Sequence, residues 1–269
     1  MPARRILYSF FALLFVVNIA VAQDDDDSHH HGSLHFSHPL IVESPSPDTK
    51  IRFDYFYERS GESGEKTGEH TARVEYEYAF RRSFSIEINA PYTFRRPEAE
   101  PHENHPGNVE VSLKFASFAF DEQKLLPVYG VSFHLPTGDA GKGIGSGHVL
   151  GVEPYVGLGY QRKKIELIAF TSLGLAANRR AGDEDGAEFG YEGSVLYKLS
   201  RRFQAVLELD GSRALTGIRS GENVVNVSPG IKILPPNEHW QIGVGAGFPV
   251  TSDQEFKARA VVSVFYHFD

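Results

Sequence analysis

The chain has 269 residues, of which 41% are hydrophobic, and carries 27 basic and 35 acidic side chains and no cysteine. Its net charge of −8 and the lack of any basic patch argue against a nucleic-acid partner. The absence of cysteine excludes disulfides and thiolate metal sites.

Residues 1–22 have the pattern of a secretory signal peptide. Arg4 and Arg5 precede an apolar run over 6–20, and Ala20-Val21-Ala22 forms a small-residue cleavage site. The alternative, an uncleaved anchor, needs about 20 apolar residues, more than this run supplies. No other window resembles a transmembrane helix, so an exported membrane protein with this sequence must span as a closed β-barrel.

Residues 23–49 differ in composition from the rest and predict a periplasmic linker or plug rather than a strand. Four aspartates and a Pro/Ser-rich stretch flank a histidine-rich tract. Imidazole and carboxylate groups are ligands for Zn²⁺, Cu²⁺ or Ni²⁺, so the tract is a candidate divalent-metal site. The alternative is a tract that binds metal only adventitiously. No other cofactor is expected. The candidate ligands are His29, His30, His31, His35 and His38.

From residue 50 the sequence alternates with period two, and the connections alternate between short and long. Twelve strands are expected, in preference to ten or fourteen. A periplasmic β-sandwich would also alternate, but the face opposite the apolar one is too charged for a core. The expected strands are 51–58, 71–80, 83–94, 108–120, 126–135, 149–160, 164–175, 188–199, 203–210, 223–234, 239–248 and 256–269.

The last of these strands shows the alternation most clearly. Every second residue from Phe256 to Phe268 is apolar, whereas Lys257, Arg259 and His267 lie on the other face. An apolar face with aromatics at both ends is typical of a lipid-facing strand in a bacterial outer-membrane barrel. The aromatic end resembles the signal read by the barrel-assembly machinery, although Asp269 follows it.

These features predict an all-β fold, a transmembrane antiparallel up-and-down barrel in the outer membrane of a Gram-negative bacterium, with both termini periplasmic. The charged positions fall on its inward face. They form either an interior salt-bridge network or the lining of a narrow aqueous path for a small molecule or ion. The lumen candidates are Arg52, Asp54, Arg73, Glu75, Glu77, Glu87, Glu110, Lys114, Glu153, Glu166, Glu192, Glu208, Lys232, Lys257 and Arg259.

A strand end at residues 132–139 reads Ser-Phe-His-Leu-Pro-Thr-Gly-Asp. This segment, together with the barrel pattern from residue 50 onward, resembles the outer-membrane transporters related to the phenol meta-degradation pathway. The resemblance implies a transporter-like barrel and leaves its substrate undefined.

Other chemistry has weaker support. The glycine-rich loop at 138–147 lacks the spacing of a phosphate-binding loop. A second potential metal cluster, His102, Glu103 and His105, lies in an expected external loop. Ser132 and His134 share a face that points away from lipid, which disfavours a lipid hydrolase. No enzyme is therefore expected.

Three function classes remain. The first is a porin-like solute channel or transporter, with or without a link to metal. The others are a closed structural or adhesive barrel and, less favoured, a lipid-modifying enzyme.

Overall fold

The computed structural model describes residues 34–61, 67–97, 102–178, 186–236 and 239–268. The expected signal peptide and His29, His30 and His31 lie outside these residues. Within the described part, no helix has the length and hydropathy of a membrane span.

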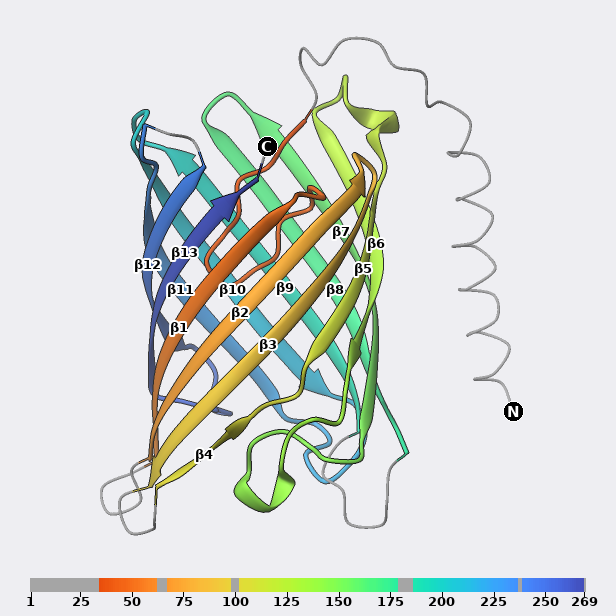
Figure 1. The fold of residues 1–269 in the computed structure, drawn as a ribbon, viewed down its shortest axis with the longest axis vertical. Coiled ribbons are helices and arrows are strands. Elements are labelled where there is room, and N and C mark those ends of the chain that lie inside the picture. Colours follow the sequence, from red (N-terminus) through yellow and green to blue (C-terminus); the bar gives the residue numbers. More distant parts are fainter. Residues whose placement is uncertain (1–33, 62–66, 98–101, 179–185, 237–238, 269) are drawn as a thin grey trace.

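The chain forms a closed antiparallel barrel of tilted strands (Figure 1). Apart from β4, each strand pairs with the next one in the chain, β3 pairs with β5, and β1 pairs with β13, so twelve strands form the ring, as expected. A thirteenth, β4, pairs only with β3. The strands are β1 (Lys50–Ser60), β2 (Thr67–Arg81), β3 (Phe84–Pro97), β4 (Glu103–Pro106), β5 (Glu110–Ala116), β6 (Leu125–His134), β7 (Leu150–Arg162), β8 (Ile165–Ala177), β9 (Ala187–Lys198), β10 (Phe203–Ala214), β11 (Asn223–Ile233), β12 (Trp240–Pro249) and β13 (Ala258–His267).

The outer surface is an apolar belt with exposed aromatic side chains, the composition that lipid requires. Strict alternation produces it, because neighbouring positions on each strand point to opposite faces. Along β1, Ile51, Phe53, Tyr55 and Tyr57 are exposed, whereas Arg52 and Asp54 between them are buried.

Two expected boundaries on either side of residue 100 are wrong. The loop expected at 95–106 contains the end of β3 and all of β4, which pair from Tyr92 with Pro106 to Arg95 with Glu103. Prolines suggested a loop there, but an edge strand tolerates them because its outer N–H groups need no partner. The strand expected at 108–120 stops at Ala116, and a short 3-10 helix, Phe118–Phe120, follows it.

The alternation of the last strand also fails at its start. β13 begins at Ala258, and Phe256, expected to face lipid, is buried beneath the Arg259 guanidinium, whose carbon lies 4.2 Å from the ring centre. Lys257, expected in the lumen, is exposed. The phase of the pattern changes there because these two residues precede the regular strand.

Residues 34–49, hereafter the luminal segment, enter the barrel at the end with the short turns, run down its interior and return to start β1 (Figure 1). The C-terminal end of β13 lies at the same end. The segment's apolar residues form a core inside the barrel with inward residues of five strands. That core comprises Leu34, Phe36, Val42, Ala116, Leu126, Val128, Ile168, Phe170, Leu196 and Val206.

Candidate functional site

One carboxylate on β10 holds the bend of the luminal segment. Glu208 Oε1 accepts hydrogen bonds from the backbone N–H groups of Leu40, Ile41 and Val42 at 3.1, 2.9 and 2.9 Å. Glu208 is 1% exposed. A buried loop must satisfy its backbone polar groups somewhere, and here an anion on the barrel wall satisfies three donors.

Charged side chains of β1, β11 and β8 bind other backbone groups of the same segment. Arg52 on β1 donates to the Leu40 carbonyl, and Lys232 on β11 donates to that of His38. Glu166 on β8 accepts from the backbone N–H of Ser37 at 2.7 Å. Charged side chains from four strands therefore bind the segment from several sides.

Glycines on the inner wall leave room for the segment's large side chains. A Cβ added at Gly243 would lie 2.1 Å from Leu40 Cδ2, and one at Gly159 would lie 2.6 Å from Phe36 Cζ. Both contacts are closer than packed carbons allow. The inner wall is therefore complementary in shape to the luminal segment at Leu40 and Phe36.

A compact charge cluster lies on the β1–β3 and β5 side of the lumen. Lys50, which is fully buried, pairs with Glu75 at 2.6 Å and with Glu77 at 2.5 Å. Lys114 also pairs with Glu77, at 3.0 Å, and with Glu43 of the luminal segment at 3.6 Å. This part of the inner face is a salt-bridge network, the first of the two expected arrangements.

A second ion-pair chain continues along β1, β2 and β13. Asp54 accepts from Arg52 at 2.8 Å, Arg73 at 2.7 Å and the Ser263 hydroxyl at 2.5 Å. Arg259 pairs with Glu58 at 2.5 Å. Seven side chains of the expected lumen set therefore form ion pairs in these two clusters: Arg52, Asp54, Arg73, Glu75, Glu77, Lys114 and Arg259.

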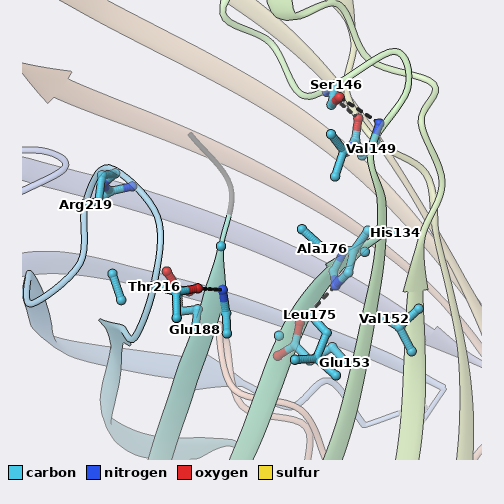
Figure 2. Close-up of a pocket in the computed structure, with 16 residues that line it drawn as sticks. His134, Ser146, Val149, Val152, Glu153, Leu175, Ala176, Glu188, Thr216 and Arg219 are labelled. Atoms are coloured by element: carbon cyan, nitrogen blue, oxygen red, sulfur yellow. Dashed lines mark hydrogen bonds and ion pairs between the residues drawn. The ribbon is translucent and has the colours of Figure 1, made fainter. Parts of the chain in front are cut away.

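The half of the lumen toward the long loops holds two adjoining cavities, hereafter the vestibule. The outer one, about 300 Å³, is lined partly by loop residues such as Ser146 and Arg219 (Figure 2). The inner one, about 260 Å³, reaches the luminal segment at Ile41 and Glu43. His134 and Glu153 line both cavities.

The vestibule wall carries more carboxyl groups than cations. Its basic residues are Arg73, Lys114 and Arg219. Figure 2 shows His134 beside Glu153 on the neighbouring strand, and their Nε2 and Oε2 atoms are 2.9 Å apart. Tyr155, Phe170 and Tyr191 add aromatic surface on the inner cavity. Its acidic residues are Glu43, Glu87, Glu110, Glu153, Glu188 and Glu192.

The expected lumen residues therefore divide into three groups. Arg52, Asp54, Glu75, Glu77, Glu166, Glu208, Lys232 and Arg259 belong to ion-pair networks or hold the luminal segment. Arg73, Glu87, Glu110, Lys114, Glu153 and Glu192 line the inner cavity. Lys257 belongs to neither group.

Two of the five metal candidates, His35 and His38, meet two residues outside that candidate set, Asp48 and His267. His38 Nε2 and His35 Nε2 lie 3.1 and 3.6 Å from Asp48 Oδ2, and His267 Nδ1 of β13 lies 2.7 Å from the same oxygen. By contrast, His102, Glu103 and His105 bring no cluster of ligating atoms together in the described part of the chain. Histidines far apart in sequence thus share one carboxylate.

Burial and hydrogen bonding together set the protonation of this group. Burial, followed by the charge of Lys50, lowers the pKa of His38 well below its usual value, so the ring is neutral. Burial alone would raise the pKa of Asp48, but hydrogen bonds from His267, His35 and His38 outweigh it and lower that pKa. The site combines a carboxylate with at least one neutral imidazole.

The serine and histidine considered for hydrolysis have other partners. Ser132 Oγ lies 2.7 Å from Ser112 Oγ, and His134 bonds Glu153 as described. The residues that sequence reasoning missed are mainly those of the luminal segment and its apolar seat, by which we mean the packing of Phe36 and Leu40 against the inner wall. Their signal is the alternation of Leu34, Phe36, His38, Leu40 and Val42, all buried.

Known structures share this architecture at low sequence identity. An outer membrane channel from Pseudomonas putida F1 is similar with a TM-score of 0.63 and 11% identity, over 90% of this chain and 100% of that one. The NanC porin is similar with a TM-score of 0.56 and 12% identity, over 82% of this chain and 99% of that one. The KdgM porin is similar with a TM-score of 0.51 and 13% identity, over 81% of this chain and 99% of that one.

A search of curated proteins found no match. The model of the family described as "Putative MetA-pathway of phenol degradation" matches residues 107–264, more than half of the chain. The chain therefore belongs to this family.

Proposed function

We propose that this protein is an outer-membrane channel for small polar solutes, with a preference for cationic over anionic ones, and that the luminal segment closes it. The observation that carries the proposal is the acidic vestibule, which runs from the long loops to the luminal segment at Ile41 and Glu43. Similar folds among outer membrane channels and porins support it.

The fold supports a direction for this closure. The short turns, the return of the luminal segment and the end of β13 share one end of the barrel (Figure 1). In bacterial barrels short turns face the periplasm and long loops face outside. The vestibule would then receive solute from outside, and the luminal segment would stand between it and the periplasm.

Conductance in planar bilayers tests the closure. The mature protein is expected to conduct weakly, and a variant lacking residues 23–49 severalfold more strongly, because removal of the segment clears the lumen beside Glu208 and Lys232. Heat-modifiable electrophoretic mobility checks that both barrels are folded. Absence of conductance from two folded proteins would contradict a channel and favour the closed structural barrel.

Cation preference is expected to depend on the vestibule carboxyl groups. In the variant lacking residues 23–49, Glu110→Gln should lower the K⁺ to Cl⁻ permeability ratio about twofold. That factor corresponds to about 0.4 kcal/mol, the effect of one charge roughly 10 Å away in water. Reversal potentials in a KCl gradient measure the ratio. The control Glu122→Gln changes the net charge equally at an exposed turn and should leave the ratio unaltered; equal effects would exclude the vestibule as the selective region.

A further inference from the structure

Four side chains at the short-turn end of the lumen have the composition of a transition-metal site. One ligating atom each of His38, Asp48 and His267 lies within 4.8 Å of the others. The fourth, His35, has its Nε2 atom 3.6 Å from Asp48 Oδ2. Three imidazoles and one carboxylate form a ligand set that Zn²⁺ accepts in tetrahedral geometry.

The spacing suits a shared ion. With metal–ligand bonds of about 2.0–2.1 Å, the donor atoms of a tetrahedral site lie roughly 3.3 Å apart. The three nitrogens lie 2.7, 3.1 and 3.6 Å from Asp48 Oδ2 and so straddle that value. Small side-chain rotations would place the donors of His38, Asp48 and His267 around one ion, and a larger rotation of the exposed His35 would add the fourth donor.

The hydrogen bonding among these groups is also poorly matched without an ion. Three ring nitrogens converge on one carboxylate oxygen, which has two lone pairs. The other ring nitrogens of His38 and His267, Nδ1 and Nε2, are buried and have no hydrogen-bond partner in the described part of the protein. Neither imidazole is therefore committed to a second polar group.

The surroundings allow an ion to reach the site. His35 is exposed over 57% of its side chain, which leaves a route from the end of the barrel. Lys50, a buried cation whose charge acts on His38, is neutralised by Glu75 at 2.6 Å and Glu77 at 2.5 Å. Its charge is therefore offset before it opposes a divalent ion.

We infer that His35, His38, Asp48 and His267 bind a divalent transition metal such as Zn²⁺, and that this ion fastens the luminal segment to β13. His35, His38 and Asp48 belong to the segment, whereas His267 belongs to the wall. Metal would favour the seated segment because it binds this arrangement more tightly than the released one. Metal binding at this site does not depend on the proposed channel function. Only an effect of the metal on solute passage rests on the proposed function.

Isothermal titration of the mature protein with Zn²⁺ tests the site. The intact protein and a variant with His29, His30 and His31 all changed to alanine should both bind one ion tightly. His38→Ala and His267→Gln should each weaken that binding at least tenfold, the usual scale for disturbing a metal site. The control His105→Ala should bind as the parent does. Tight binding lost in the triple variant but retained in His267→Gln would overturn the inference in favour of an adventitious tract.

Thiol labelling tests the fastening and does not depend on conductance. The chain has no cysteine, so Val42→Cys supplies a single reporter at a fully buried position of the luminal segment. Zn²⁺ should slow its reaction with a water-soluble maleimide, a chelator should restore the rate, and His267→Gln should abolish both effects. If titration shows Zn²⁺ binding but the labelling rate of the thiol does not change with Zn²⁺, the ion does not fasten the luminal segment to β13. That conclusion would hold whatever the conductance of the barrel.

Discussion

Glu208→Ala is expected to release the luminal segment from the barrel wall and to raise conductance toward that of the variant lacking residues 23–49. The carboxylate is the shared acceptor of three backbone N–H groups at 2.9–3.1 Å. Hydrogen bonds to a charged group contribute about 1.5–3 kcal/mol each, although water recovers part of this when the segment leaves. A net loss of about 3 kcal/mol would shift the seated-to-released equilibrium by a factor of about 100 to 200.

The reactivity of Val42→Cys reports the release directly, since Val42 is buried and its N–H is one of the three donors. Labelling should accelerate in the Glu208→Ala background. Glu208→Gln, which keeps an oxygen acceptor without the charge, should give an intermediate rate. The matched control Glu188→Ala removes a vestibule carboxyl group of β9 from an exposed position and should leave labelling unchanged. If Glu208→Ala labels no faster than Glu188→Ala, other contacts hold the segment.

The barrel could be predicted from sequence because lipid imposes a simple rule on it. Every outward position must be apolar, so a period-two pattern repeats in each strand and its phase identifies the inward residues. Arg52, Glu75 and Glu208 were assigned to the lumen on that basis, and all three are buried inside the barrel. Phe256 departs from the lipid-facing pattern, and Lys257 joins no described ion-pair network or cavity lining, because both residues precede the start of the regular strand at Ala258.

The luminal segment could not be predicted with equal ease because nothing comparable constrains it. Its proline and histidine content is typical of a linker, and its hydrogen bonds go to distant residues: Leu40 bonds Glu208, 168 positions away. The same distance hid the metal candidates, since Asp48 and His267 are separated by 219 positions. Only the alternation from Leu34 to Val42 indicates a buried face. It is too short to identify the surface against which that face packs.

The inward charges also have two roles that periodicity alone does not separate. Lys50, Glu75 and Glu77 are buried against one another, whereas Glu110 and Glu153 border open volume. The difference comes from the luminal segment, which fills one half of the lumen, hereafter the dry half, and leaves cavities that water can enter in the other, the wet half. A charge in the dry half must be paired, and a charge in the wet half is available to a solute.

The dry half makes Lys50 the side chain whose loss should cost most stability. Lys50→Met leaves Glu75 and Glu77 buried without their nearest cation, and Glu87, 3.9 Å from the ammonium, adds a third carboxyl group. Breaking one side of a buried ion pair costs about 3–5 kcal/mol, because the remaining charge loses both water and partner. Thermal unfolding followed by heat-modifiable mobility should show a clearly lower midpoint than that of the parent.

Two further variants separate lost pairing from lost packing. Lys50→Met combined with Glu75→Gln removes charge from both sides of the 2.6 Å pair and should recover part of the stability, because one carboxylate no longer lacks its partner. Arg219→Met breaks an ion pair with Glu222 in which both side chains are more than 40% exposed, and should cost less than about 1 kcal/mol. If Lys50→Met is as mild as Arg219→Met, or if Glu75→Gln worsens it, the cluster is not held together by the charge of Lys50, and the apolar seat of Phe36 and Leu40 would have to supply that stability instead.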